Sequence, residues 1–205
     1  MACALRFLVR LVNRGKSEPS DAKALASSAY QLVRVYGADV GNLRVSHAAI
    51  EFDLLLPSRD ILPSATRALE EGLGPLLTLR ELDTPAPQMD VGRAVDEGIG
   101  LFNEERYWES HEALEYAWRR ADGPEKEVLQ GIILLAAALV HLQKNEPSVA
   151  LSVMARANEK LSPYRGERFG VSIDAVRETV SGMIADERPG FFKIGARPYG
   201  SRAAA

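Results

Sequence analysis

The chain has 205 residues, of which 46% are hydrophobic and 26% are charged. This composition fits a globular protein of one or two domains and excludes disordered, collagen-like and disulfide-rich classes. The formal net charge of −3 gives no reason to expect nucleic acid or an anionic membrane as a partner. Because the single Cys3 cannot form an internal disulfide, and Arg6 and Arg10 interrupt the first apolar stretch, we expect a cytoplasmic protein.

Residues 1–83 alternate between strand-like and helix-like periodicity. Their patterns predict strands over 5–12, 43–46, 49–56 and 76–82, one helix from the Ser20-Asp21 cap to Gly37, and a second helix over 61–71. The order β-α-β-β-α-β predicts a ferredoxin-like sandwich, with two helices on one face of an antiparallel sheet. This fold hosts many functions, so we expect no more from it than a regulatory or dimerising module with one free sheet face.

A different organisation follows after residues 84–90, a predicted linker whose two prolines disfavour both helix and strand. Residues 91–189 contain no strand-like segment, and we expect an all-α bundle of about five helices there. The predicted helices span 91–105, 107–121, 125–144, 149–161 and 173–185. Together the two halves predict an α+β chain. Residues 190–205 are a predicted tail in which Phe191 and Phe192 dock on the bundle.

The helix expected over 107–121 carries a histidine and a carboxylate within its most aromatic stripe. With about 100° per residue, Glu115 lies about 40° from His111, and the two side chains are one turn apart. Glu112 flanks the stripe, whereas Glu109 points away from it and is expected to be solvated. Burying an unpaired ion costs several kcal/mol, so the buried polar residues should be paired. The other members of this stripe are Tyr107, Trp108, Leu114 and Trp118.

The next predicted helix carries a matching polar stripe. Gln130 and His141 are separated by about 20° on its helical wheel. An antiparallel hairpin places Glu115 opposite Gln130 and predicts a hydrogen bond between them. His141 lies about 10 Å further along the axis than His111, so a compact His111–Glu115–His141 metal site forms only with favourable rotamers.

The residues of these two helices resemble a known family. HEALEYAW (111–118) fits a His-x-x-x-Glu-x-x-Trp pattern. The stretch FNEERYWESHEALEYAWRR, followed by LQGIILLAAALVHLQ, resembles the signature of domain-of-unknown-function family 309, a family of small helical proteins from bacteria and archaea. The resemblance covers residues 91–189, including SPYRGERFGVSID, and leaves residues 1–83 outside. It implies a helical fold and a shared polar cluster, and it brings no established reaction.

Two functions and one purely structural interpretation stay open at this point. The first function is a binding or regulatory module that presents a groove near the two tryptophans, with a small molecule, a protein or a second copy of the chain as partner rather than nucleic acid. The alternative is a metal-assisted hydrolase with a divalent metal on His111, Glu115 and His141. HEALE differs from the zinc-peptidase pattern HExxH because Glu115 replaces the second histidine, and a carboxylate suits a harder metal than zinc. The structural interpretation is a satisfied polar network that fixes helix register. The candidate residues shared by all three are Trp108, His111, Glu112, Glu115, Trp118, Gln130 and His141.

Overall fold

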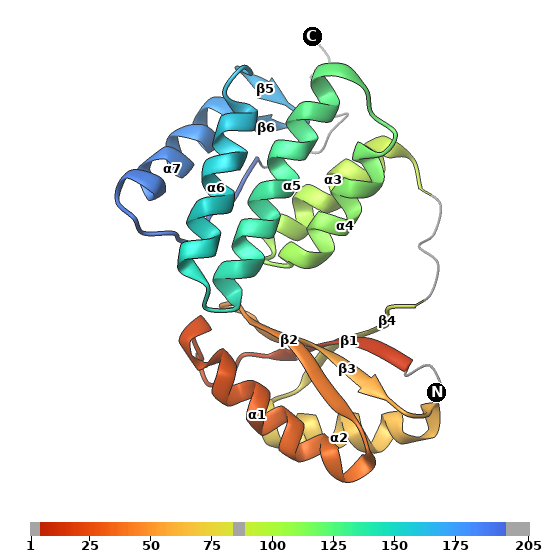
Figure 1. Cartoon of the computed structure of the whole chain (residues 1–205). Helices are drawn as coiled ribbons and strands as arrows, with labels where there is room; N and C mark the ends of the chain where they lie inside the picture. The colour runs from red at the N-terminus through yellow and green to blue at the C-terminus, as the bar shows by residue number, and fades with distance from the viewer. Residues whose placement is uncertain (1–4, 84–88, 196–205) are drawn as a thin grey trace. The chain divides into compact units, whose positions relative to one another are not determined.

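The structure is a computed structural model that describes residues 5–83 and 89–195 (Figure 1). The chain divides into two compact units, one N-terminal and one helical. Most of the predicted linker over 84–90 lies outside the described residues. No helix in the described part of the chain is both long enough and apolar enough to cross a membrane. The cytoplasmic location stays a prediction.

The N-terminal unit combines a four-stranded antiparallel sheet with two α-helices, as the α+β prediction required. Among the described residues the strands are ordered β2-β3-β1-β4, and both helices lie under one face of the sheet (Figure 1). Gly37 ends the first helical segment in a left-handed conformation, with φ of 70°, which a glycine adopts without a steric penalty. The elements are β1 (Leu5–Val12), α1 (Ala22–Val33), β2 (Asp39–Val45), β3 (Ala49–Leu56), α2 (Leu62–Leu73) and β4 (Leu76–Glu81), with 3-10 turns at Pro19–Asp21, Arg34–Tyr36 and Arg59–Ile61.

The two faces of this sheet differ in chemistry because alternate residues of a strand point to opposite faces. One face is apolar and packs on α1 and α2. It includes Phe7 and Val9 of β1 and Phe52 and Leu54 of β3, all of which are buried in one core with Ala29 of α1. Burial of this apolar surface is the main favourable contribution to the stability of the unit.

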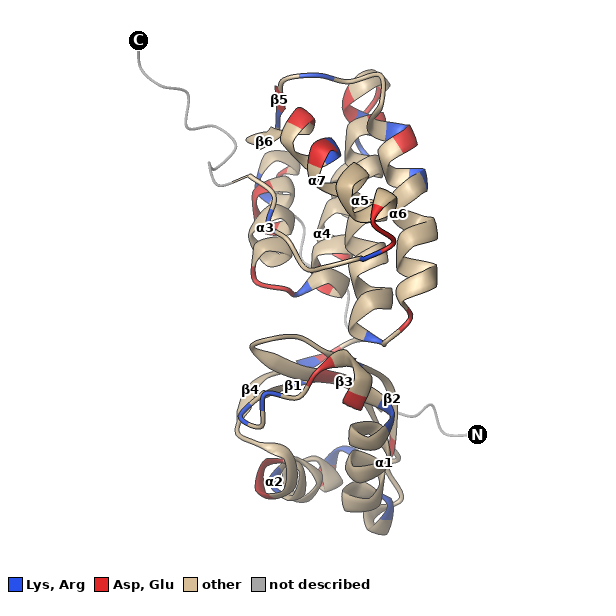
Figure 2. Cartoon of the chain, turned by 90° about the vertical axis from the view of Figure 1, so that its left-hand side faces the viewer, with Lys and Arg blue, Asp and Glu red and all other residues tan. Residues whose placement is uncertain are grey.

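The other face of the sheet carries ion pairs between neighbouring strands. Arg10 of β1 stands opposite Glu51 of β3, and Arg44 of β2 stands opposite the same Glu51. The nitrogen–oxygen distances are 3.2 Å from Arg10 to Glu51, 2.8 Å from Arg44 to Glu51 and 2.7 Å from Arg6 to Asp53. Figure 2 shows the acidic positions of β3 beside basic positions of its neighbours. Arg44 and Asp53 are each only 2% exposed and lie within this network of ion pairs. The expected role of this face as a free surface for packing stays a prediction.

The helical unit contains five α-helices in its described residues, in agreement with the prediction. They are α3 (Val91–Asn103), α4 (Tyr107–Trp118), α5 (Gly123–Gln143), α6 (Pro147–Leu161) and α7 (Ile173–Ala185). Between α6 and α7, where the sequence predicted no strand, the chain forms a short hairpin, β5 (Glu167–Arg168) with β6 (Val171–Ser172). The unit is therefore not strictly all-α, because strands of two residues are too short to produce a periodic pattern.

The segment after α7 docks on the bundle as predicted. The ring of Phe191 stacks on Tyr107 at 5.9 Å, and Phe192 meets Phe102 edge-on at 5.6 Å. The side-chain amide of Asn103 donates to the carbonyl oxygens of Ile194 and Gly195 at 2.7 and 2.8 Å. Aromatic contact and backbone hydrogen bonds together fix this segment on α3 and α4. The rest of the predicted tail, 196–205, lies outside the described residues.

Candidate functional site

Helix α4 is rotated relative to the orientation predicted from its aromatic stripe. Ser110, Leu114 and Ala117 are buried, which places the centre of the buried face about 90° away from His111. His111 is half-buried and Glu112 is exposed. The small Ser110 faces the core because α3 approaches closely there, and its hydroxyl donates to the carbonyl oxygen of Gly98 at 2.7 Å. The prediction that His111 lies in the middle of the buried stripe is therefore wrong.

Glu109 is the buried carboxylate of α4, contrary to the prediction that it is solvated. Its side chain sits against the guanidinium of Arg106, which donates to both carboxylate oxygens, at 2.7 and 2.8 Å. The hydrogen bonds to Glu109 raise the pKa of Arg106 above its usual range, against the opposing effect of burial. The signal in the sequence is the arginine three residues before the glutamate, a spacing that brings the two side chains together on a helix.

Glu115 and His141 each have a local partner instead of the partners expected across the helix pair. Glu115, 35% exposed, accepts a hydrogen bond from Arg119 at 2.9 Å, whereas the sequence predicted Gln130. His141 contacts Glu146, the residue that caps the start of α6, with 2.5 Å between Nδ1 and Oε2. Among the described residues, no group of three or more His, Cys, Asp or Glu side chains is arranged to hold a metal ion. The predicted buried cluster is thus divided into separate, half-exposed ion pairs.

Helix α5 runs through the unit, and between residues 128 and 139 its half-exposed residues lie along one stripe. Gln130, Leu134, Ala137 and His141 are half-buried, and their spacing of four, three and four residues keeps them on one side of the helix. The residues around the rest of its circumference are largely buried in the core of the unit. This stripe contains both candidate residues that the sequence placed on the second helix.

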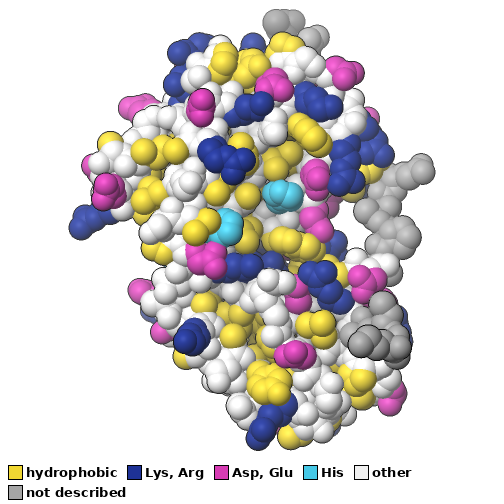
Figure 3. Space-filling model, in the orientation of Figure 1, with side chains coloured by type: hydrophobic (Ala, Val, Ile, Leu, Met, Phe, Trp, Pro, Cys, Tyr) yellow, Lys and Arg dark blue, Asp and Glu magenta, His cyan; other side chains and the backbone are white. Residues whose placement is uncertain are grey.

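Helices α4 and α6 lie on either side of this stripe. On the α4 side the ammonium group of Lys126 lies 4.9 Å from the ring of Trp118. On the α6 side Lys160 pairs with Glu127, and a Cβ atom on Gly131 would come within 2.5 Å of Leu161. Figure 3 shows two histidine side chains on one face of the molecule, with hydrophobic side chains beside them.

Helix α6 contributes two valines to the same side. Val149 and Val153 are eleven and seven residues before Lys160, which places both within about 20° of it on the helical wheel. Val149 is 43% exposed, and Val153 is partly buried against the core. We call the combined surface the central face. It consists of His111 and Trp118 of α4, Gln130, Leu134, Ala137 and His141 of α5, and Val149 and Val153 of α6.

The two tryptophans differ in position, since Trp118 belongs to the central face and Trp108 lies next to it. Trp118 is half-buried, and its indole nitrogen is buried without a hydrogen-bond partner among the described residues. Trp108 is half-buried one turn before His111 and lies at the rim. Both tryptophans therefore lie beside the polar candidate residues. These residues form an open surface, whereas the sequence predicted a buried cluster.

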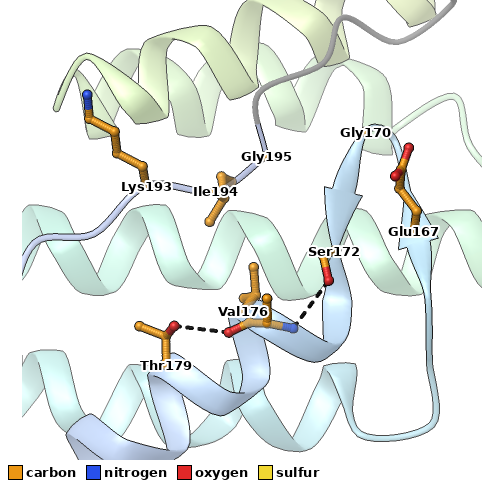
Figure 4. A pocket seen from close by; sticks show the side chains of 9 residues that line it. Glu167, Gly170, Ser172, Val176, Thr179, Lys193, Ile194 and Gly195 are labelled. Atoms are coloured by element: carbon orange, nitrogen blue, oxygen red, sulfur yellow. Dashed lines mark hydrogen bonds between the residues drawn. The ribbon is translucent and has the colours of Figure 1, made fainter.

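A separate cavity of about 350 Å³ lies between the β5–β6 hairpin, α7 and residues 193–195 (Figure 4). The hydroxyl groups that line the cavity form hydrogen bonds with the backbone of α7. Ser172 accepts from the N–H of Ala175, and Thr179 donates to the carbonyl oxygen of Ala175. Val176 and Ile194 point toward one another inside it. Sequence reasoning missed this cavity because a hairpin without periodicity and the docked C-terminal segment form its walls.

Part of the helical unit matches the model of a known protein family. Residues 95–153 match the family model described as Domain of unknown function (DUF309). The resemblance to that family is confirmed for this segment. The DUF309 match runs from α3 into α6 and includes every residue of the central face, whereas the cavity of Figure 4 lies beyond its end. None of the curated proteins matches the chain.

Proposed function

We propose that the helical unit is a binding module and that the central face is its recognition surface for a helical segment of a protein partner. The observation that carries this proposal is the half-exposed stripe on α5, a helix whose remaining residues between 128 and 139 are buried. From Gln130 to His141 the stripe is about 16 Å long, or three turns. A partner helix packs well along such a stripe, because recognition of a helix uses apolar anchors spaced by three and four residues.

The composition of the central face supports an interface. Its middle contains Leu134, Ala137 and Val153, whereas its charged neighbours are Glu115 with Arg119, Lys160 with Glu127, and His141 with Glu146. Interfaces commonly combine an apolar centre that includes aromatic residues with a polar rim.

The pairing of the polar residues favours binding over metal-assisted hydrolysis. A hydrolytic metal centre on His111, Glu115 and His141 needs an imidazole and a carboxylate that converge on one point. Glu115 instead contacts Arg119, and His141 contacts Glu146. Each of these groups therefore has an electrostatic partner that a metal ion would have to displace.

For the N-terminal unit we propose a ferredoxin-like topology with a regulatory or scaffolding role. The strand order β2-β3-β1-β4, the antiparallel pairing and the position of α1 and α2 under one face support this topology. The ion pairs on the other face neutralise its charged side chains, which would ease the burial of that face against another surface.

Tryptophan fluorescence and NMR can test the binding proposal, since both tryptophans of the chain lie in or next to the central face. The probe is an 18-residue amphipathic peptide with leucine and alanine on one side and glutamine on the other. We expect it to shift the amide resonances of α5 around Leu134 and Ala137, and to lose binding in Ala137→Glu. The matched control is Ala155→Glu, an exposed position about 140° from Lys160 on the wheel of α6.

Two outcomes would contradict the proposal. In the first, the peptide causes no shifts on the central face, or binds Ala137→Glu as well as it binds the native protein. In the second, the purified protein retains stoichiometric divalent metal in elemental analysis and loses it in Glu115→Gln. The second outcome would favour the hydrolase alternative.

A further inference from the structure

We infer that the partner helix is acidic at the end that lies over Gln130. This inference rests on the proposed function, because it specifies the chemistry of the partner on the central face. Four cationic side chains surround that end of the face: Arg119, Lys126, Arg156 and Lys160. Two carboxylates, Glu115 and Glu127, pair with Arg119 and Lys160. Lys126 and Arg156 have no carboxylate partner among the described residues.

The two remaining cations flank Gln130 from both sides. Lys126 is one turn before Gln130 on the same side of α5. Arg156 is one turn before Lys160 on α6, and the pairing of Lys160 with Glu127 in this antiparallel helix pair places Arg156 level with residue 131. Figure 3 shows Lys and Arg side chains gathered over the end of this face where α4 ends and α5 begins. The positive charge is therefore local, even though residues 84–188 contain more acidic than basic side chains.

The spread of these cations fits several carboxylates on a helix better than one small anion. They belong to neighbouring helices, whose axes are typically about 8–10 Å apart. Lys126 also lies against the ring of Trp118, which limits its side-chain freedom before any partner binds. A partner helix with its apolar side on Leu134 and Ala137 would place glutamate or aspartate side chains within reach of both Lys126 and Arg156.

Three peptides with the same leucine and alanine side can test the inference, with glutamate, glutamine or lysine at the polar positions. We expect the glutamate peptide to bind the full-length protein about tenfold more tightly than the glutamine peptide at low salt. That advantage should disappear at 0.5 M NaCl, because salt screens exposed charges. Lys126→Gln and Arg156→Gln should each reduce the advantage of the glutamate peptide without changing the affinity for the glutamine peptide. Arg188→Gln, an exposed position outside the central face, is the matched control.

The outcomes separate this inference from the proposed function. Equal affinity for all three peptides, together with loss of binding in Ala137→Glu, would overturn the acidic partner and leave the binding face intact. Failure of all three peptides to bind would overturn both. Binding to phosphatidylserine vesicles that is lost in Lys126→Gln, with no preference among the peptides, would replace the acidic helix with an anionic lipid surface.

Discussion

The guanidinium of Arg106 holds the carboxylate of Glu109 through two parallel hydrogen bonds, from Nε to Oε2 at 2.7 Å and from Nη2 to Oε1 at 2.8 Å. Glu109 is 8% exposed, so the pair stands at the edge of the core where α4 begins. Hydrogen bonds between charged groups are stronger than neutral ones, and this geometry fits two acceptor oxygens to two donors. The pair thereby fixes the first turn of α4 relative to the segment before it.

Glu109→Gln should reduce the free energy of unfolding by about 1–3 kcal/mol, because an amide nitrogen would face the guanidinium in place of one oxygen. Urea denaturation followed by tryptophan fluorescence measures this change, since both tryptophans belong to the helical unit. The exposed Glu178→Gln on α7 is the control and should change stability by less than about 0.5 kcal/mol. Equal effects of the two substitutions would show that the ion pair contributes nothing specific.

Tyr107 and Tyr116 lie on the same helix but differ in the environment of their hydroxyl groups. The buried hydroxyl of Tyr107 has no hydrogen-bond partner among the described residues. Tyr116 donates to the carbonyl oxygen of Met89 at 2.8 Å and accepts from its N–H at 3.2 Å. Tyr107→Phe should therefore be neutral or stabilising by up to about 1 kcal/mol, whereas Tyr116→Phe should cost about 1 kcal/mol. Thermal unfolding at pH 7 compares the two, and a reversed order would contradict this account.

The same tyrosine predicts a dependence of stability on alkaline pH. Burial raises the pKa of Tyr107, and the nearby Glu105 raises this pKa further. In the unfolded chain the phenol ionises near pH 10, whereas in the folded chain it keeps its proton to higher pH. The unfolded state therefore binds fewer protons above pH 10, and stability falls as the pH rises. Tyr107→Phe should flatten the decline between pH 9 and 11, and an unchanged slope would exclude Tyr107 as its source.

In the N-terminal sheet, the carboxylate of Glu51 forms ion pairs with two arginine side chains. Glu51→Gln removes the charge between Arg10 and Arg44, which are 8% and 2% exposed. Breaking a buried pair leaves an uncompensated buried charge, so we expect a loss of about 3–5 kcal/mol. Hydrogen exchange of the β3 amides measures this loss. Arg59→Gln is the control, because Arg59 contacts Glu81 at the solvent-exposed surface and its removal should change exchange little.

Local periodicity was sufficient to predict several elements of the fold. The predicted strand over 49–56 and the predicted helix over 173–185 coincide with β3 and α7. Both contain apolar residues at the period of their own element, strand or helix, and this information is contained within the segment itself. The β5–β6 hairpin was missed because its strands are two residues long, although Gly166 and Gly170, each with φ of 71°, are a turn signal around it.

The rotation of α4 could not be predicted in the same way, because neighbouring helices decide which side is buried. The aromatic stripe favoured His111 as the centre, but tryptophan is amphipathic and lies well at the boundary of a core. The buried side instead contains Ser110, whose small size allows α3 to approach at Gly98. The sequence signal that could have corrected the predicted orientation of α4 is the pair of small residues at this contact, Gly98 on α3 and Ser110 on α4.

Two glycines of α3 provide a matched test of that close approach. A Cβ atom on Gly98 would lie 2.6 Å from Cγ of Leu114, whereas a Cβ atom on Gly100 would have no atom within 4 Å. Gly98→Ala should therefore cost about 1–3 kcal/mol through overpacking. Gly100→Ala should stabilise by about 0.5–1 kcal/mol, because alanine loses less backbone entropy in a helix. Chemical denaturation of both variants measures the difference, and stabilisation by Gly98→Ala would show that α3 and α4 can separate without cost.

Asn103 holds the C-terminal segment with both ends of its side-chain amide. In addition to its two donated hydrogen bonds, its Oδ1 accepts from the N–H of Ile194 at 2.8 Å. Asn103→Ala removes all three and should cost about 1–3 kcal/mol. Asn103→Asp keeps the acceptor for Ile194 but directs a carboxylate at two carbonyl oxygens, so it should be at least as destabilising. Hydrogen exchange at the Ile194 amide should accelerate in both variants. Asn158→Ala, which removes one exposed hydrogen bond to Ser181, is the control, and slow exchange at Ile194 in Asn103→Ala would show that the stacking of Phe191 and Phe192 holds the segment without Asn103.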